Sequence, residues 1–196
     1  NDARVVYRGV ELDKFQATES KPTGSEIRFL YLGGLSPRKG NPHGMNLKGG
    51  IDLLKAWKEA LNKEDGKKSS KLYFGGPDVN ASKVEDLIQG SLMDYGIEVL
   101  GNIPMGEVKD LYHKVDIVIV PSMAEGLPNV AMEASSSECM VVASDAGGIP
   151  EAVIHGETGL IYERGNYKQL LQILEAIMLE NENPLEYGRR GRKLME

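Results

Sequence analysis

Two glutamates, Glu125 and Glu133, lie eight positions apart and enclose a Gly-Leu-Pro-Asn turn. At neutral pH a carboxylate only accepts hydrogen bonds, so it suits the O–H donors of neighbouring hydroxyl groups. Pro128 predicts that a helix begins inside this segment. The free N–H groups and positive end of a helix N-terminus favour a bound anion. Segment 125–133 therefore predicts a site for an anion that carries neighbouring hydroxyls.

Short apolar runs at 116–120 and 140–143 flank this segment and have the length of buried strands. The strand at 116–120 would place the turn and the helix N-terminus together at its carboxyl end. The strand at 140–143 would then return the chain beside the strand at 116–120. A nucleotide-sugar combines a phosphate anion with vicinal hydroxyls, so it is a ligand that such a site would suit.

The remaining pattern is an alternation of strands and helices. Further strands are predicted at 27–33, 71–75, 97–101 and 159–162, and helices at 51–61, 84–95, 105–113, 128–137, 150–154, 167–180 and 184–195. Strands that are apolar on both faces imply a parallel sheet covered on two sides. The sequence thus predicts an α/β fold, a Rossmann-like three-layer sandwich with a parallel sheet of about six strands. Ligands bind such sheets beyond the carboxyl ends of the strands, where glycines recur in this chain: Gly33, Gly34, Gly75, Gly76 and Gly101.

Composition narrows the class of protein. The chain has 196 residues and a formal net charge of −6, which argues against a nucleic-acid partner. A single cysteine, Cys139, cannot form an internal disulfide and is expected to be a small core residue. No apolar run approaches the ~20 residues that span a membrane, and no signal peptide is visible. We expect a cytoplasmic protein, at the inner membrane face if its acceptor is a lipid, and a chain that is a fragment because it begins with Asn1.

Several motifs together resemble the C-terminal, donor-binding domain of family 4 glycosyltransferases, which have the GT-B architecture of two Rossmann-like domains around a cleft. The resemblance covers nearly the whole chain, with the motifs in family order at compatible spacing. They are the entry segment 10–15, the loop 32–40, the base-binding turn 101–104, the E-x7-E segment 125–133 after Pro121 and Ser122, and the segments 145–151 and 156–160.

The resemblance implies a division of the chain into three parts. Residues 1–25 would be the interdomain entry segment, residues 26–183 the nucleotide-sugar-binding domain, and residues 184–196 a C-terminal helix that returns towards the N-terminal domain.

The resemblance also implies roles for individual residues. Glu125 would contact hydroxyls of the transferred sugar, Glu133 would take the ribose hydroxyls, and Ile103 would present its backbone to the base. The donor would also lie against backbone at the first strand end and at the helix N-terminus: Gly33, Gly34, Gly126, Leu127, Pro128, Asn129 and Val130.

Basic groups in the loop after Gly34 would neutralise the diphosphate. Spacing from Leu35 selects Lys39, whereas adjacency to the next helix selects Lys48, and both remain candidates. Many relatives have an arginine at the position of Gly34, where it contacts the phosphate. In this chain that phosphate contact is either lost or made by Arg38. Because Lys and Arg replace the cation on the leaving group, the resemblance implies no metal and no cofactor.

The implied reaction transfers a sugar from a nucleotide diphosphate-sugar, UDP- or GDP-linked, to an acceptor hydroxyl with retention at the anomeric carbon. The acceptor, a glycan, lipid or small molecule, would bind the N-terminal domain, so the fragment alone is expected to be inactive. Two alternatives stay open: a non-catalytic nucleotide-sugar-binding module and a nucleotide-sugar epimerase of GT-B architecture.

Overall fold

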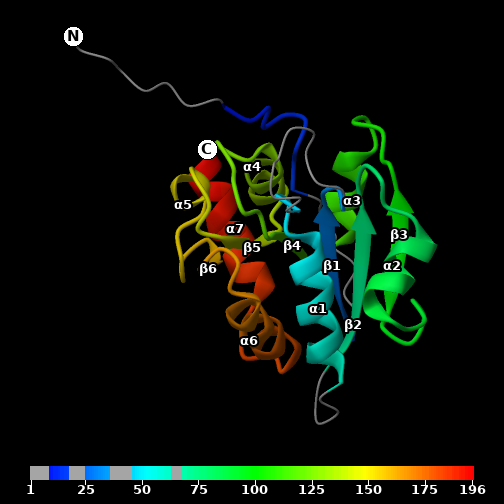
Figure 1. The fold of residues 1–196 in the computed structure, drawn as a ribbon. Helices are drawn as coiled ribbons and strands as arrows, with labels where there is room; N and C mark the ends of the chain where they lie inside the picture. Colours follow the sequence, from blue (N-terminus) through cyan, green and yellow to red (C-terminus); the bar gives the residue numbers. More distant parts are fainter. Residues whose placement is uncertain (1–8, 18–24, 36–45, 63–67) are drawn as a thin grey trace.

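The computed structural model describes residues 9–17, 25–35, 46–62 and 68–196. In this part of the chain six parallel strands form one sheet in the order β3-β2-β1-β4-β5-β6 (Figure 1). The strands are β1 (Glu26–Leu32), β2 (Ser69–Gly75), β3 (Ile97–Gly101), β4 (Ile117–Val120), β5 (Met140–Ser144) and β6 (Gly159–Tyr162). The predicted parallel α/β sheet is confirmed.

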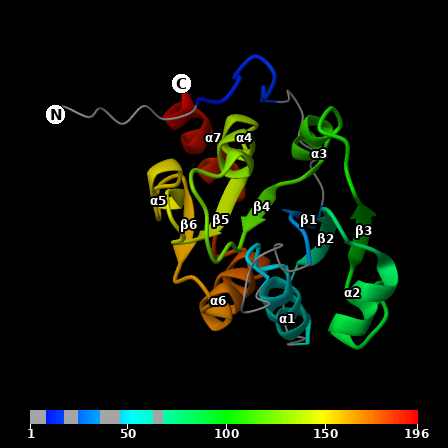
Figure 2. The same cartoon turned by 45° about the horizontal axis from the view of Figure 1, so that its top comes forward.

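Helices cover both faces of the sheet, as Figure 2 shows. They are α1 (Gly50–Leu61), α2 (Ala81–Ile88), α3 (Val108–Lys114), α4 (Asn129–Ser136), α5 (Ile149–Ala152), α6 (Tyr167–Met178) and α7 (Pro184–Met195). One apolar core joins α1, α2 and α6 to the sheet, and a second joins α3, α4 and α5 to the opposite face. Each strand contributes alternate side chains to the two cores, which is the period of a pleated strand.

Two predicted helices begin three residues away from their predicted starts, and the others differ by no more than two residues at either end. The helix predicted at 84–95 begins at Ala81, because the Asn80 side chain accepts a hydrogen bond from the Lys83 N–H as an N-cap, and it ends at Ile88. Gln89 follows in the left-handed region at φ 50°, which stops the helix. The helix predicted at 105–113 begins only at Val108.

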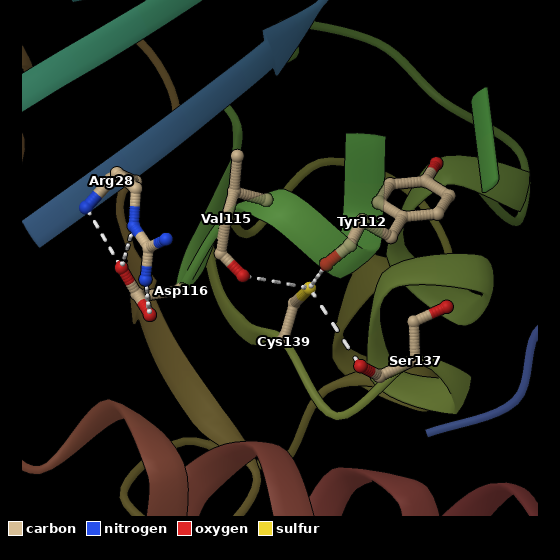
Figure 3. Close-up of polar contacts among 6 residues, drawn as sticks. All are labelled: Arg28, Tyr112, Val115, Asp116, Ser137 and Cys139. Atoms are coloured by element: carbon tan, nitrogen blue, oxygen red, sulfur yellow. Dashed lines mark hydrogen bonds and ion pairs between the residues drawn. The ribbon is translucent and has the colours of Figure 1, made fainter. Parts of the chain in front are cut away.

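The order in which the chain adds strands to the sheet reverses between β1 and β4. The chain builds β1, β2 and β3 outwards in one direction and then returns to place β4 on the other side of β1. At the amino ends of these two strands the Arg28 guanidinium pairs with both Asp116 carboxylate oxygens, each at 3.0 Å (Figure 3). The Arg28 N–H donates to the same carboxylate at 2.9 Å, so the two strands are fixed side by side at this end.

The thiol of Cys139 lies in the second core, as the sequence predicted. It is fully buried and its nearest carbonyl acceptor, that of Tyr112, lies 3.2 Å away (Figure 3). This contact joins the turn after α4 to the end of α3. Cys139 is thus a small core residue that helps to fix α3 against β5.

Helix α7 packs against α4 and the start of β5 through two glycines. A Cβ atom at Gly188 would overlap the carbonyl oxygen of Glu138, whereas one at Gly191 would lie 3.4 Å from the Ser135 side chain, an ordinary contact distance. Glu138 itself has φ 55°, so the turn that meets Gly188 is already in the left-handed region.

We predict that Gly188→Ala lowers the free energy of unfolding by about 1–3 kcal/mol, because α7 must move away from the Glu138 carbonyl. Gly191→Ala is the matched control on the same helix. It should leave stability unchanged or raise it by up to about 1 kcal/mol, since alanine is the better helix former. Urea unfolding of both variants measures the difference, and equal effects would contradict the packing described.

Candidate functional site

A pocket of about 380 Å³ opens where β1 and β4 end. Its lining comes from the ends of these two strands, the loop before α1 and the turn that begins α4: Tyr31, Leu32, Lys48, Ile119, Val120, Pro121, Ser122, Glu125, Leu127, Pro128, Asn129 and Val130. The pocket therefore lies at the carboxyl ends of the strands and at the switch in strand order, where α/β sheets bind ligands.

Two loops meet at the pocket through a close backbone contact. Gly49, with φ 71°, lies so near β4 that a Cβ atom there would overlap the Pro121 carbonyl oxygen. Beside it, the Met123 N–H donates to the Leu47 carbonyl at 2.8 Å. Only glycine has both the positive φ and the room for this approach, which brings Lys48 to the loop after β4.

Lys48 and Glu125 form an ion pair across the pocket, between Nζ and Oε1. The Ser122 hydroxyl donates to the same Glu125 oxygen at 2.8 Å, and the Ser144 hydroxyl donates to the Ser122 carbonyl at 2.5 Å. The Glu125 side chain is 14% exposed and that of Lys48 is 50% exposed. The solvent-accessible ammonium of Lys48 thus faces the Glu125 carboxylate, which Ser122 holds in place.

The base of the pocket is supported by Tyr31. Its hydroxyl donates to the Gly34 carbonyl at 3.1 Å, and the Asn46 side-chain amide donates to the same oxygen at 2.9 Å. Burial raises the pKa of Tyr31 far above its usual range, although a hydrogen bond from the Gly50 backbone acts in the opposite direction. Tyr31 therefore stays a neutral donor and ties the end of β1 to the loop that carries Lys48.

Gly33 and Gly34 lie at the end of β1, next to the pocket. Gly34 leaves little room for a side chain, because a Cβ atom there would lie 3.1 Å from the Pro77 carbonyl oxygen. Ile103 lies further along the same edge of the sheet, where its Cδ1 would be 2.5 Å from a Cβ atom at Gly75. It lines a separate hollow beside α3 rather than the pocket.

Glu133 lies on α4, after the residues that line the pocket, and is half-buried. Its Oε2 accepts a hydrogen bond of 3.0 Å from the hydroxyl of Tyr112, which is fully buried. Burial, and secondarily the charge of Glu133, raise the pKa of Tyr112 well above its usual range.

The structure thus brings together some of the predicted site residues. Lys48 and Glu125 pair directly, and the turn at 127–130 lines the same pocket. Gly126 is exposed in the same turn, and its carbonyl accepts from the Gly148 N–H at 2.8 Å. Arg38 and Lys39 lie outside the described residues, so the structure gives a position only for Lys48.

Sequence reasoning missed three residues that support the site. Tyr31, Ser144 and Tyr112 act through contacts between elements far apart in the chain, and no local pattern identifies such contacts. The hydroxyl of Ser122 had a weak signal, since it stands three positions before Glu125, within reach across one turn.

Within the described ranges, no group of three or more His, Cys, Asp or Glu side chains could hold a metal ion. None of the helices placed in these ranges is long and apolar enough to cross a membrane.

The parallel sheet, covered by helices on both faces, defines a Rossmann-like α/β domain with a pocket at its switch point. The family model described as "Glycosyl transferases group 1" matches residues 14–194, and the chain belongs to this family. Its fold is that of the C-terminal domain of GT-B glycosyltransferases.

The curated proteins that this chain resembles include several named as glycosyltransferases. The chain is 30% identical to the D-inositol 3-phosphate glycosyltransferase of Corynebacterium glutamicum, over 94% of this chain and 45% of that protein. The protein of the same name from Corynebacterium diphtheriae is 35% identical over 59% of this chain and 28% of that protein. The chain thus spans less than half the length of either of these relatives.

Solved structures share the fold at low sequence identity. The C-terminal domain of a glycosyl transferase group 1 family protein, LpcC, from Francisella tularensis has a TM-score of 0.73 at 22% identity, with 95% of this chain and 96% of that chain covered. Anabaena HepE, solved in complex with UDP and glucose, has a TM-score of 0.73 at 19% identity, over 98% of this chain and 52% of that chain.

We predict that Gly49→Ala lowers the free energy of unfolding by at least about 2 kcal/mol, because alanine is strained at positive φ and its Cβ would displace the Pro121 carbonyl. Gly106→Ala is the control, since a Cβ atom there would meet nothing within 4 Å. It should change stability by less than about 0.5 kcal/mol. Urea unfolding measures both, and a fully stable Gly49→Ala variant would show that the two loops are not held together at this point.

Proposed function

We propose that this chain is the donor-binding half of a retaining, metal-independent glycosyltransferase. The donor would be a nucleotide diphosphate-sugar, UDP- or GDP-linked, and the acceptor a hydroxyl of a glycan, lipid or small molecule. The observation that carries the proposal is the pairing of Lys48 with Glu125 inside a pocket that also contains the first turn of α4. The cation and the helix N-terminus suit the diphosphate, and the carboxylate suits the hydroxyls of the sugar.

Lys48 is the group proposed to bind the diphosphate. Its ammonium is half-exposed, at the entrance of α1 and opposite the N-terminus of α4. Negative charge develops on the diphosphate as the glycosidic bond breaks, and a fixed cation stabilises this charge without a metal. The N–H groups that begin α4 would add to the same effect.

Glu125 is the group proposed to hold the transferred sugar. Ser122 fixes its carboxylate through the 2.8 Å hydrogen bond, so its orientation does not depend on Lys48 alone. When a phosphate takes Lys48, the carboxylate becomes available for sugar hydroxyls. The same negative group would stabilise the positive charge that develops on the sugar ring.

Glu133 is proposed to take the ribose hydroxyls and Ile103 to present its backbone to the base. Ile103 follows β3 and Glu133 lies on α4, which follows β4, so the two residues come after strands on opposite sides of β1. Anabaena HepE, which shares this fold, was solved in complex with UDP and glucose, and this supports a nucleotide as part of the donor.

The rest of the protein would supply the acceptor site. Because the chain covers only 45% of the C. glutamicum relative, we propose that it binds the donor and performs no turnover alone. We also place the reaction on the cytoplasmic side, at the inner membrane face if the acceptor is a lipid.

We predict that one class among UDP-, GDP- and ADP-sugars binds this chain in a calorimetric titration. Lys48→Ala and Glu133→Ala should each weaken that donor at least about tenfold, roughly 1.4 kcal/mol, because each removes a charged partner of the ligand.

Two variants serve as matched controls. Lys83→Ala changes a half-exposed residue and Glu157→Ala an exposed one. Both residues lie outside the pocket, so neither change should alter the affinity. If no donor binds the wild-type chain, or if the control variants weaken binding as much as the site variants, the proposed function is wrong.

A further inference from the structure

Tyr112 reaches the nucleotide side of the proposed site from the interior of the protein. It lies on α3 and is fully buried, yet its hydroxyl donates to Glu133 on α4 at 3.0 Å. Glu133 has three rotatable side-chain bonds, and a bond from a rigid partner removes most of that freedom.

Two contacts fix the position of Tyr112, and a third interaction holds one of its partners. Its ring meets the Phe15 ring edge-on, with 6.0 Å between the centroids. The Phe15 carbonyl in turn accepts a hydrogen bond of 2.8 Å from the Arg192 guanidinium. The Tyr112 carbonyl lies 3.2 Å from the Cys139 thiol (Figure 3). The hydroxyl is therefore held at one point in space.

The direction of the hydrogen bond is also fixed. Burial raises the pKa of Tyr112 well above its usual range, so the phenol keeps its proton at neutral pH and acts as the donor. Oε2 of Glu133 is the acceptor, which leaves Oε1 to receive a hydroxyl from a ligand.

We propose that Tyr112 is a positioning residue that orients the Glu133 carboxylate towards the two ribose hydroxyls of the bound nucleotide. This inference rests on the proposed function, since it assumes that Glu133 receives the ribose. Tyr112 itself touches no ligand. It acts by reducing the conformational freedom that Glu133 would otherwise lose on binding.

A purely structural role for Tyr112 makes a different prediction. If the hydroxyl only satisfies its own hydrogen-bonding need in the core, its loss would change stability and leave the recognition of ribose intact. The discriminating measurement is the ratio of the dissociation constants of a nucleoside diphosphate and its dideoxy analogue, which lacks both ribose hydroxyls.

The test uses Tyr112→Phe, which keeps the ring and its contact with Phe15 and removes only the hydroxyl. Tyr187→Phe is the matched control, because Tyr187 donates to Glu182 Oε2 at 2.8 Å in the same kind of pair, on α7 and outside the pocket. Titrations with UDP, GDP and ADP, each beside its dideoxy analogue, give the ratio for the wild type and both variants.

We expect Tyr112→Phe to reduce the discrimination between ribose and dideoxyribose at least about fivefold, and Tyr187→Phe to leave it unchanged. In a Glu133→Ala background, Tyr112→Phe should have no further effect on the ratio. Undiminished discrimination in Tyr112→Phe overturns this inference and leaves the proposed function in place. Failure of all three nucleotides to bind the wild type overturns both.

A second measurement needs no variant. In the wild-type chain the buried Tyr112 hydroxyl proton should give a slowly exchanging proton resonance. The nucleotide that binds should shift it, and its dideoxy analogue should shift it much less. Equal shifts with both ligands would show that the hydroxyl does not respond to the ribose.

Discussion

The close contact between Gly49 and Pro121 is the constraint on which the site depends. It presses the loop before α1 onto the loop after β4, two segments that the chain order separates by three strands and three helices. Without this approach Lys48 would not reach Glu125, and the pocket would have neither its cation nor its wall. A backbone contact that only glycine permits thus determines where two charged side chains meet.

The rest of the fold keeps that junction in register. The Arg28–Asp116 pair joins β1 to β4 at their amino ends, and Tyr31 ties the carboxyl end of β1 to the Lys48 loop. The two apolar cores hold the sheet from both faces, so the strand ends cannot shift relative to one another. The site is consequently preorganised: its charges are placed by the fold before a ligand arrives.

Local patterns in the sequence predicted most of the fold, because apolar runs and glycine ends identify buried strands directly. They failed for α2, where Asn80 capping and the left-handed Gln89 decided the bounds. The turn at 125–130 was recognisable because its residues are adjacent in the chain. Spacing could not choose between Lys39 and Lys48. The structure gives a position only for Lys48, through the approach of the neighbouring Gly49 to Pro121 and through the ion pair with Glu125.

In the proposed complex, a sugar diphosphate occupies the pocket between β1 and β4 and takes Lys48 from Glu125. A crystal structure of this chain with the nucleotide diphosphate-sugar that binds it is the decisive measurement. We predict a diphosphate oxygen within hydrogen-bonding distance of Lys48 Nζ, the sugar against Glu125, and the Lys48–Glu125 pair opened. A donor bound outside this pocket, or bound with that ion pair intact, would contradict this prediction.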